Sequence, residues 1–161
     1  MARLRIDPER SKVVIEASSS LHPIHSEAKG LEGWVDLDAG AGHLELPVSR
    51  LRSPNPLEER ELKRRIDARR HPTIEGDVTT LAAAGDGRYR VTGDVTFRGV
   101  RKAYDDELAV EPHDDGGVRI TGRAGFDVRD FGMEPPKILL IRVHPDVTVS
   151  IDVVAVPDPG R

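Results

Sequence analysis

The chain has no cysteine, and this absence removes several classes of chemistry at once. Without cysteine there is no disulfide bond, no thiol nucleophile, no cysteine-ligated zinc and no iron–sulfur cluster. An excess of charge of one sign is also missing, because 24 basic residues stand against 28 acidic ones, for a net charge of −4. This balance provides no general electrostatic attraction to nucleic acid. We therefore expect no nucleic-acid partner.

Long apolar runs are absent too. Even the strongly apolar run at residues 138–141 ends far short of the roughly 20 residues that a membrane-spanning helix needs. The opening segment, Met1 to Pro8, has neither the apolar core nor the cleavage site of a secretory signal. We therefore expect a soluble, cytoplasmic protein without stable membrane insertion.

The size of the chain fits one domain with its own core. It has 161 residues, of which 37% are hydrophobic. A chain of this length buries roughly two-thirds of its unfolded surface. No internal repeat or low-complexity linker divides it. We predict a single domain over residues 1–157, followed by a short tail at 158–161.

Alternation of apolar and polar residues predicts β-strands. Over residues 89–97 the odd positions read Tyr-Val-Gly-Val-Phe and the even ones Arg-Thr-Asp-Thr. This period of two is typical of a strand with one buried and one solvated face. Glycine- and aspartate-rich turns separate the segments, which favours an antiparallel barrel or sandwich over parallel β-α-β units. The predicted strands cover residues 4–7, 12–19, 31–38, 43–48, 73–81, 89–97, 104–110, 118–128, 138–143 and 147–153.

One helix is predicted, at about residues 56–69. Asn55 is a favourable N-cap, and the proline after it suits the first helical position, where a missing N–H costs nothing. Leu62 and Ile66 form a narrow apolar stripe, which Leu57 joins from the first turn. We expect the helix to pack by this stripe across an opening of the barrel.

Four segments, taken in chain order, resemble the motifs of a known family. They are Ile6-Asp7-Pro8 with Ser11-Lys12-Val13; Arg60-Glu61-Leu62 with Ile66-Asp67 and His71-Pro72-Thr73-Ile74; residues 89–100, Tyr-x-Val-x-Gly-Asp-Val-Thr-Phe-x-Gly-Val; and Arg129-Asp130-Phe131-Gly132. Together they are similar to the YceI-like family, over nearly the whole chain.

The resemblance implies a fold and a type of ligand. The expected fold is all-β, an antiparallel eight-stranded lipocalin-like β-barrel with one short α-helix. The better-known members of the family carry polyisoprenoids or other long apolar chains, so the resemblance implies an apolar ligand inside the barrel.

Inward-facing positions of the predicted strands are the first candidates for ligand contact. An eight-stranded barrel is just wide enough for its own side chains to fill, which would make these positions a packed core. In a hollow barrel the same positions would line an apolar tunnel closed by the helix, where each buried methylene of a lipid chain gains ~0.8 kcal/mol. Both interpretations stay open. The positions are Tyr89, Val91, Val95, Phe97, Leu108, Ile120, Phe126, Val149 and Ile151.

His22 and His25 have three alternative interpretations. Two imidazoles at this spacing could chelate a divalent metal, with Glu27, His71 or His144 as a third ligand. In a surface hairpin, one histidine would instead bond to the backbone while the other contacts water. His22 could also lie at the pocket mouth and contact the polar head of a ligand.

Arg129 is the other candidate for a polar contact. Its guanidinium could bind an acidic head group through two hydrogen bonds. The simpler hypothesis, which we favour, is an ion pair with Asp130 that fixes the turn after a strand.

The chain contains no motif of nucleophilic, phosphate or dinucleotide chemistry. There is no Gly-x-Ser-x-Gly elbow and no glycine-rich phosphate loop. We therefore expect no enzyme and no cofactor, but carriage of a long isoprenoid, quinone or fatty-acyl molecule. The alternatives are a packed barrel that self-associates or binds a partner, and a metal-dependent enzyme that uses His22 and His25. A homodimer is compatible with such a barrel, although one sequence does not reveal it.

Overall fold

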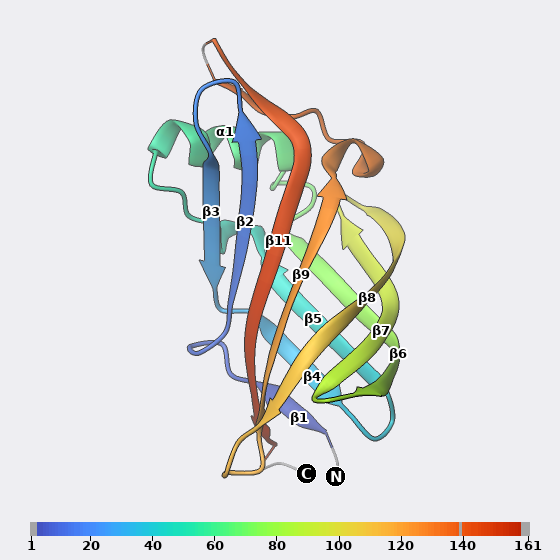
Figure 1. The fold of residues 1–161 in the computed structure, drawn as a ribbon. Helices are drawn as coiled ribbons and strands as arrows, with labels where there is room; N and C mark the ends of the chain where they lie inside the picture. The colour runs from blue at the N-terminus through green and yellow to red at the C-terminus, as the bar shows by residue number, and fades with distance from the viewer. Residues whose placement is uncertain (1–2, 139, 159–161) are drawn as a thin grey trace.

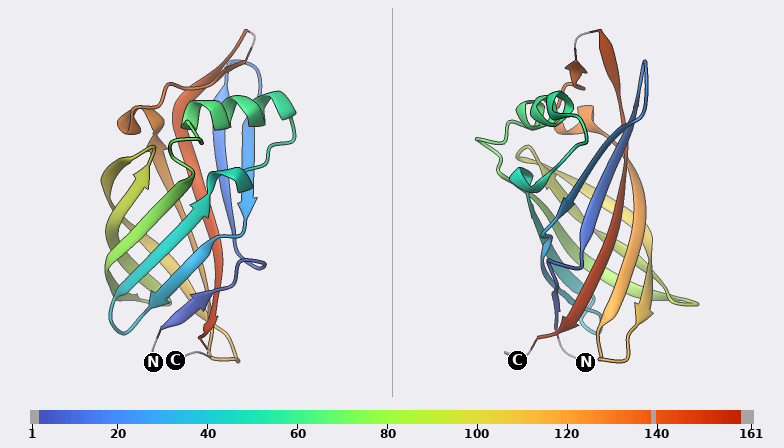
Figure 2. Two further views of the ribbon diagram at one scale, coloured as in Figure 1. Left: turned by 180° about the vertical axis from the view of Figure 1, so that it is seen from behind. Right: turned by 90° about the vertical axis from the view of Figure 1, so that its left-hand side faces the viewer.

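Antiparallel strands make up most of this computed structural model, which describes residues 3–138 and 140–158 (Figures 1 and 2). The strands are β1 (Leu4–Ile6), β2 (Lys12–Ser19), β3 (Ile24–Lys29), β4 (Glu32–Asp36), β5 (Ala41–Pro47), β6 (Thr73–Gly85), β7 (Arg88–Phe97), β8 (Val100–Pro112), β9 (Val118–Asp127), β10 (Lys137–Ile138) and β11 (Ile141–Pro157). The helical segments are η1 (Val48–Arg50), α1 (Pro56–Ile66) and η2 (Val128–Phe131).

The strands close into a barrel. Its strand order is β1-β4-β5-β6-β7-β8-β9-β11, and β1 pairs back with β11 through Leu4 opposite Pro157 and Ile6 opposite Ala155. Two further strands, β2 and β3, extend the sheet from the earlier part of β11. The 17 residues of β11 allow one of its edges to pair first with β2 and then with β1. The predicted antiparallel eight-stranded barrel is confirmed.

Helix α1 covers one end of the barrel. We call this end the upper end and the opposite end, where both termini lie, the lower end (Figure 1). The Asn55 side chain caps the helix by accepting hydrogen bonds from the N–H groups of Leu57 and Glu58, at 2.8 and 3.4 Å. The prediction that the helix runs to Arg69 is wrong. Asp67 takes the left-handed conformation, with φ 62° and ψ 58°, and ends the helix at Ile66. No helix in the described part of the chain is long and apolar enough to cross a membrane.

Two strand predictions also need correction. No strand was predicted at residues 24–29, yet β3 pairs with β2 there, and its buried positions are the small residues Ser26 and Ala28. The expected strand at 138–143 is instead a hairpin, in which Lys137 of β10 pairs with Arg142 of β11. Residue 139 lies outside the described residues, as do 1–2 and most of the expected tail, 159–161.

Side chains fill the barrel toward its lower end. Leu4, Ile6 and Ala155 come from the strands that close the barrel, and all three are buried. The void left among the neighbouring side chains measures only about 40 Å³. Other buried side chains around this void are Val35, Leu81, Val110, Ile120 and Val153.

On the outer face of β5 and β6, His43 lies between two carboxylates. Its Nε2 is 2.9 Å from Glu45 Oε1 and its Nδ1 is 2.7 Å from Asp77 Oδ1. Carboxylates accept hydrogen bonds, so a ring with both nitrogens protonated satisfies both contacts. The hydrogen bonds to Glu45 and then Asp77 raise the pKa of His43 above its ordinary value of 6.5.

The raised pKa of His43 predicts a pH-dependent contribution to stability. A group whose folded pKa is raised stabilises the fold fully below its unfolded pKa, near 6.5, and loses this effect as the pH rises through the folded pKa. His43→Gln should therefore reduce the free energy of unfolding most below about pH 6 and progressively less above it. Urea denaturation of both proteins across this range measures the difference. An equal cost at every pH would contradict the prediction.

A second prediction concerns Gly33 on β4. Its φ is 141°, and a Cβ at this position would collide with the carbonyl oxygen of His43 on β5. Gly85 also has a positive φ, 95°, but a Cβ there would meet nothing within 4 Å. Gly85→Ala should cost about 1–2 kcal/mol from backbone strain alone, whereas Gly33→Ala should cost about 3 kcal/mol or more. Equal losses in urea denaturation would show that the close approach between β4 and β5 carries no penalty.

Candidate ligand-binding site

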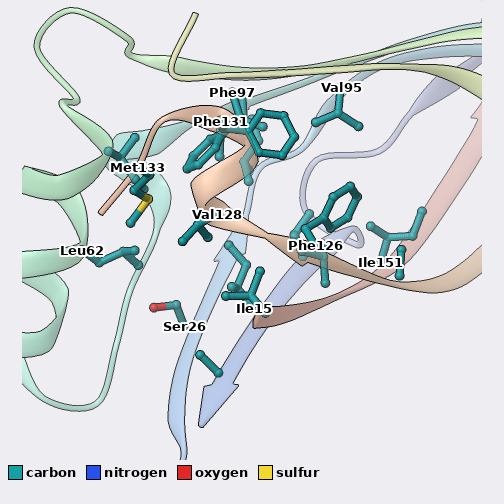
Figure 3. A pocket seen from close by; sticks show the side chains of 18 of the residues that line it. Ile15, Ser26, Leu62, Val95, Phe97, Phe126, Val128, Phe131, Met133 and Ile151 are labelled. Carbon is teal, nitrogen blue, oxygen red and sulfur yellow. The ribbon is translucent and has the colours of Figure 1, made fainter. Parts of the chain in front are cut away.

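The upper half of the barrel encloses an apolar cavity. Its volume is about 260 Å³, and its lining comes from the strands, from η2 and from α1. An apolar cavity of about 150 Å³ already binds benzene, and typical small-molecule pockets begin at about 300 Å³. Figure 3 shows side chains from these elements around one common space. They include Ile15, Leu62, Val95, Phe97, Phe126, Val128, Phe131, Met133 and Ile151.

Small residues at inward positions account for the space. Ala17, Ser26, Gly76 and Ala124 all line the upper cavity, whereas at Gly122 the Leu108 side chain occupies the place that a Cβ would take. At Gly76 a Cβ would come no closer than 3.8 Å to Leu44, which is ordinary van der Waals contact. The lower void is instead bordered mostly by leucine, isoleucine and valine, with Trp34 and Gly42 as the exceptions.

Leu44, Leu108 and Ile151 form the floor of the cavity. These three residues line both the upper cavity and the small void below it. The barrel is therefore packed in its lower half and hollow in its upper half. The two interpretations of the interior, a filled core and an apolar space, each apply to one half.

An aromatic cluster lies where β8 and β9 separate. Among the described residues these strands pair only from Ala109 to Pro112 on β8 and from Val118 to Thr121 on β9. Above that point, the ring of Tyr104 on β8 stacks on Phe126 of β9, with centroids 5.8 Å apart. Phe131 packs against both Phe126 and Phe97, at 6.3 and 5.5 Å. All three phenylalanines of the chain thus gather at this wall of the cavity.

Tyr104 remains protonated over a wide pH range in this cluster. Burial of its phenol, followed by the nearby charge of Asp106, raises the pKa of Tyr104 to about 12. The hydroxyl therefore brings no negative charge to the cavity wall at neutral pH.

The predicted inward-facing residues divide between the two halves of the barrel. Ile120 borders the small lower void, Val91 is buried in the core, and Tyr89 packs against the core without lining either space. The odd-numbered β7 positions from 89 to 97 share one face but run from the lower to the upper end, so their common face does not bring them to one site. The predicted residues that line the upper cavity are Val95, Phe97, Leu108, Phe126, Val149 and Ile151.

Arg129 lies outside the cavity. Its side chain is exposed on η2, and its Nη2 is 2.7 Å from Asp127 Oδ2. This ion pair lowers the pKa of Asp127 and raises that of Arg129. The prediction that Asp130 pairs with Arg129 is wrong. Asp127, the N-cap of η2, is the partner, because its carboxylate accepts hydrogen bonds from both the backbone N–H and the guanidinium of Arg129.

The two histidines have separate partners. His25 lies on β3, with its Nε2 3.3 Å from Glu27 Oε2. His22 lies in the β2–β3 turn, with its Nδ1 2.9 Å from the carbonyl oxygen of Pro23 and its Nε2 3.5 Å from Glu58 Oε1. Within residues 3–138 and 140–158, no group of three or more histidine, aspartate or glutamate side chains is placed to hold a metal ion.

Glu58 is the site residue that the sequence interpretation missed. It lines the cavity, its side chain is only 6% exposed, and its Oε1 has no hydrogen-bond partner among the described residues. The position expected to join Leu62 and Ile66 was Leu57, but Leu57 is 51% exposed. The available signal was the spacing 58-62-66, which places this carboxyl on the same helix face as the apolar stripe.

Two other polar side chains of the lining, Ser26 and His144, have partners, whereas Glu75 is only half-buried and Arg123 is exposed. Ser26 Oγ lies 2.6 Å from Ser53 Oγ, and His144 Nδ1 lies 2.8 Å from Ser18 Oγ. Glu58 therefore stands out as a buried polar group that faces an apolar space without a hydrogen-bond partner at its Oε1.

A closed antiparallel barrel with a helix across one end is the architecture of lipocalin-like barrels. The family model for the YceI-like domain matches residues 4–155, and the chain belongs to this family. No curated protein matches it closely enough in sequence to count as a relative.

Solved structures show the same fold at low sequence identity. BcnA of Burkholderia cenocepacia superimposes with a TM-score of 0.81 at 16% identity, covering 92% of this chain and 98% of that one. A polyisoprenoid binding domain from Saccharophagus degradans, implicated in plant cell wall breakdown, gives a TM-score of 0.81 at 13% identity, with 96% and 98% covered. The YceI protein of Campylobacter jejuni gives 0.68 at 16% identity, with 83% and 84% covered.

The orientation of α1 on the barrel predicts that alanine substitutions at two leucines of this helix will destabilise the fold unequally. Leu62 faces the cavity, whereas Leu57 points to solvent. Leu62→Ala should lower the free energy of unfolding by about 1–3 kcal/mol, and Leu57→Ala by less than about 0.5 kcal/mol. Urea denaturation of the two variants checks this. A larger loss for Leu57→Ala would mean that α1 covers the barrel by a different face.

Proposed function

We propose that this protein binds an apolar small molecule in the upper cavity and carries it without changing it chemically. The observation that carries this proposal is the space of about 260 Å³ among apolar side chains, closed below by a packed floor. The fold relative from Saccharophagus degradans, described as a polyisoprenoid binding domain, supports the same type of ligand. An isoprenoid, quinone or fatty-acyl chain has the required apolar surface.

The free energy of such binding comes from removing the apolar chain of the ligand from water. Each methylene that enters the cavity contributes ~0.8 kcal/mol, from which the cost of immobilising the ligand is subtracted. Because 260 Å³ lies below the about 300–1,000 Å³ of typical ligand pockets, the cavity takes one end segment of a long chain. The part of the ligand that follows this segment lies at the upper end, beside α1.

Filling the cavity with a larger side chain should abolish this binding. Val149 and Thr148 are neighbours on β11, but only Val149 lines the cavity. Native mass spectrometry of freshly purified protein, followed by organic extraction, should detect an apolar adduct in the wild type and in Thr148→Trp. The adduct should be absent from Val149→Trp, because its indole occupies the same space.

The outcome separates the proposal from its main alternative. If the wild type shows only the mass of the protein without an adduct, and takes up no apolar molecule from a total lipid extract, the carrier function is contradicted. The barrel would then act through its surface, by self-association or by binding a partner. Thermal melting of both tryptophan variants verifies that each one is folded.

A further inference from the structure

The carboxyl group of Glu58 lies where a purely apolar ligand would offer it no hydrogen-bond donor. Its carboxyl is buried at the edge of the cavity, next to His22, whose side chain is 43% exposed. A polar atom removed from water is destabilising unless it forms a hydrogen bond, and a carboxyl group forms strong ones. Oε1 of Glu58 has no such partner in the part of the chain that the structure describes.

The orientation of His22 adds a second acceptor beside this oxygen. A carbonyl oxygen only accepts hydrogen bonds, so the contact of 2.9 Å to the carbonyl of Pro23 requires a proton on Nδ1 of His22. In the neutral ring Nε2 then carries no proton. While the ring is neutral, Nε2 and Glu58 Oε1, 3.5 Å apart, are therefore two acceptors that face one another without a donor between them, whereas a doubly protonated ring would pair with this carboxyl.

We infer that these two atoms bind the head group of the ligand, and that this head is a hydrogen-bond donor. This inference rests on the proposed function and specifies its ligand as an apolar chain ending in an ammonium or hydroxyl group. The apolar chain of the ligand points down to the floor of the cavity, formed by Leu44, Leu108 and Ile151. The head group of the ligand donates hydrogen bonds to Glu58 Oε1 and His22 Nε2. An ammonium binds best, because it has several protons and a charge opposite to that of a carboxylate.

An acidic head group is disfavoured at the same place. A carboxylate or phosphate would bring further acceptors against Glu58 and His22. Among the described lining residues, the one lysine or arginine is Arg123. Its exposed side chain also borders the outer depression that contains Lys12 and Asp152, so it belongs to the outer face of β9.

Ligands that differ only in their head group test this inference. The apolar fluorophore N-phenyl-1-naphthylamine is bound first and then displaced at pH 8 by decylammonium, 1-decanol or decanoate, each below its micelle concentration. For the wild type we expect decylammonium to displace the probe at a concentration about tenfold lower than decanoate, with decanol between them. Glu58→Gln should reduce this ratio to about threefold or less.

Glu59→Gln is the matched control. It removes the same charge from the neighbouring position of α1, where Glu59 faces Lys63 and the N–H of Ser53 rather than the cavity. The control should keep the wild-type ratio, which separates a contact with Glu58 from a general attraction of cations to an acidic protein. His22→Ala, at a more exposed position, should lower the ratio as well and provides a test if Glu58→Gln does not fold.

The results distinguish this inference from the proposed function. If the probe and the decyl compounds bind but show equal affinity for all heads, or if Glu58→Gln and His22→Ala leave the ratio unchanged, the head-group assignment is wrong and the carrier function stands. If neither the probe nor any decyl compound binds, both proposals fail.

Discussion

The size of the inward-facing side chains decides what this barrel can do. An eight-stranded barrel is only just wide enough to be filled by its own residues, so an internal space persists only where those residues are small. Gly76 on β6 and Ala124 on β9 create that space in the upper half, whereas Leu4 and Ile6 fill the lower half. The closed lower end in turn requires the pairing of β1 with β11, and α1 covers the upper end. The result is a cup with an apolar interior.

Most of the fold was predictable from local patterns in the sequence. Alternation over 89–97 predicted β7, and Asn55 with the following proline predicted the start of α1, because both signals depend on neighbouring residues alone. The strand β3 was missed because Ser26 and Ala28, its buried residues, are too small to produce a hydrophobic pattern. The early end of α1 depends on the left-handed conformation of Asp67, a residue type that also occurs inside helices.

The site was less predictable than the fold. Alternation identifies the residues that face inward, but it does not say which of them lie at the same height in a barrel with tilted strands. Val95 and Val91 share a face of β7, yet only Val95 reaches the upper cavity. Glu58 was not predicted as a site residue because acidic residues are common in the first turn of a helix, where the helix dipole stabilises their negative charge. Its burial depends on the packing of α1 against the barrel, which a single sequence does not display.

The central claim is that an apolar molecule binds inside the upper half of the barrel, and NMR with methyl-labelled protein tests it most directly. Intermolecular nuclear Overhauser effects from bound N-phenyl-1-naphthylamine report which methyl groups touch the ligand. The account predicts contacts to Ile15, Leu62 and Val149, and none to Leu4 or Ile6 in the packed lower half. Contacts confined to outward-facing leucines such as Leu57, or no contacts at all, would contradict it.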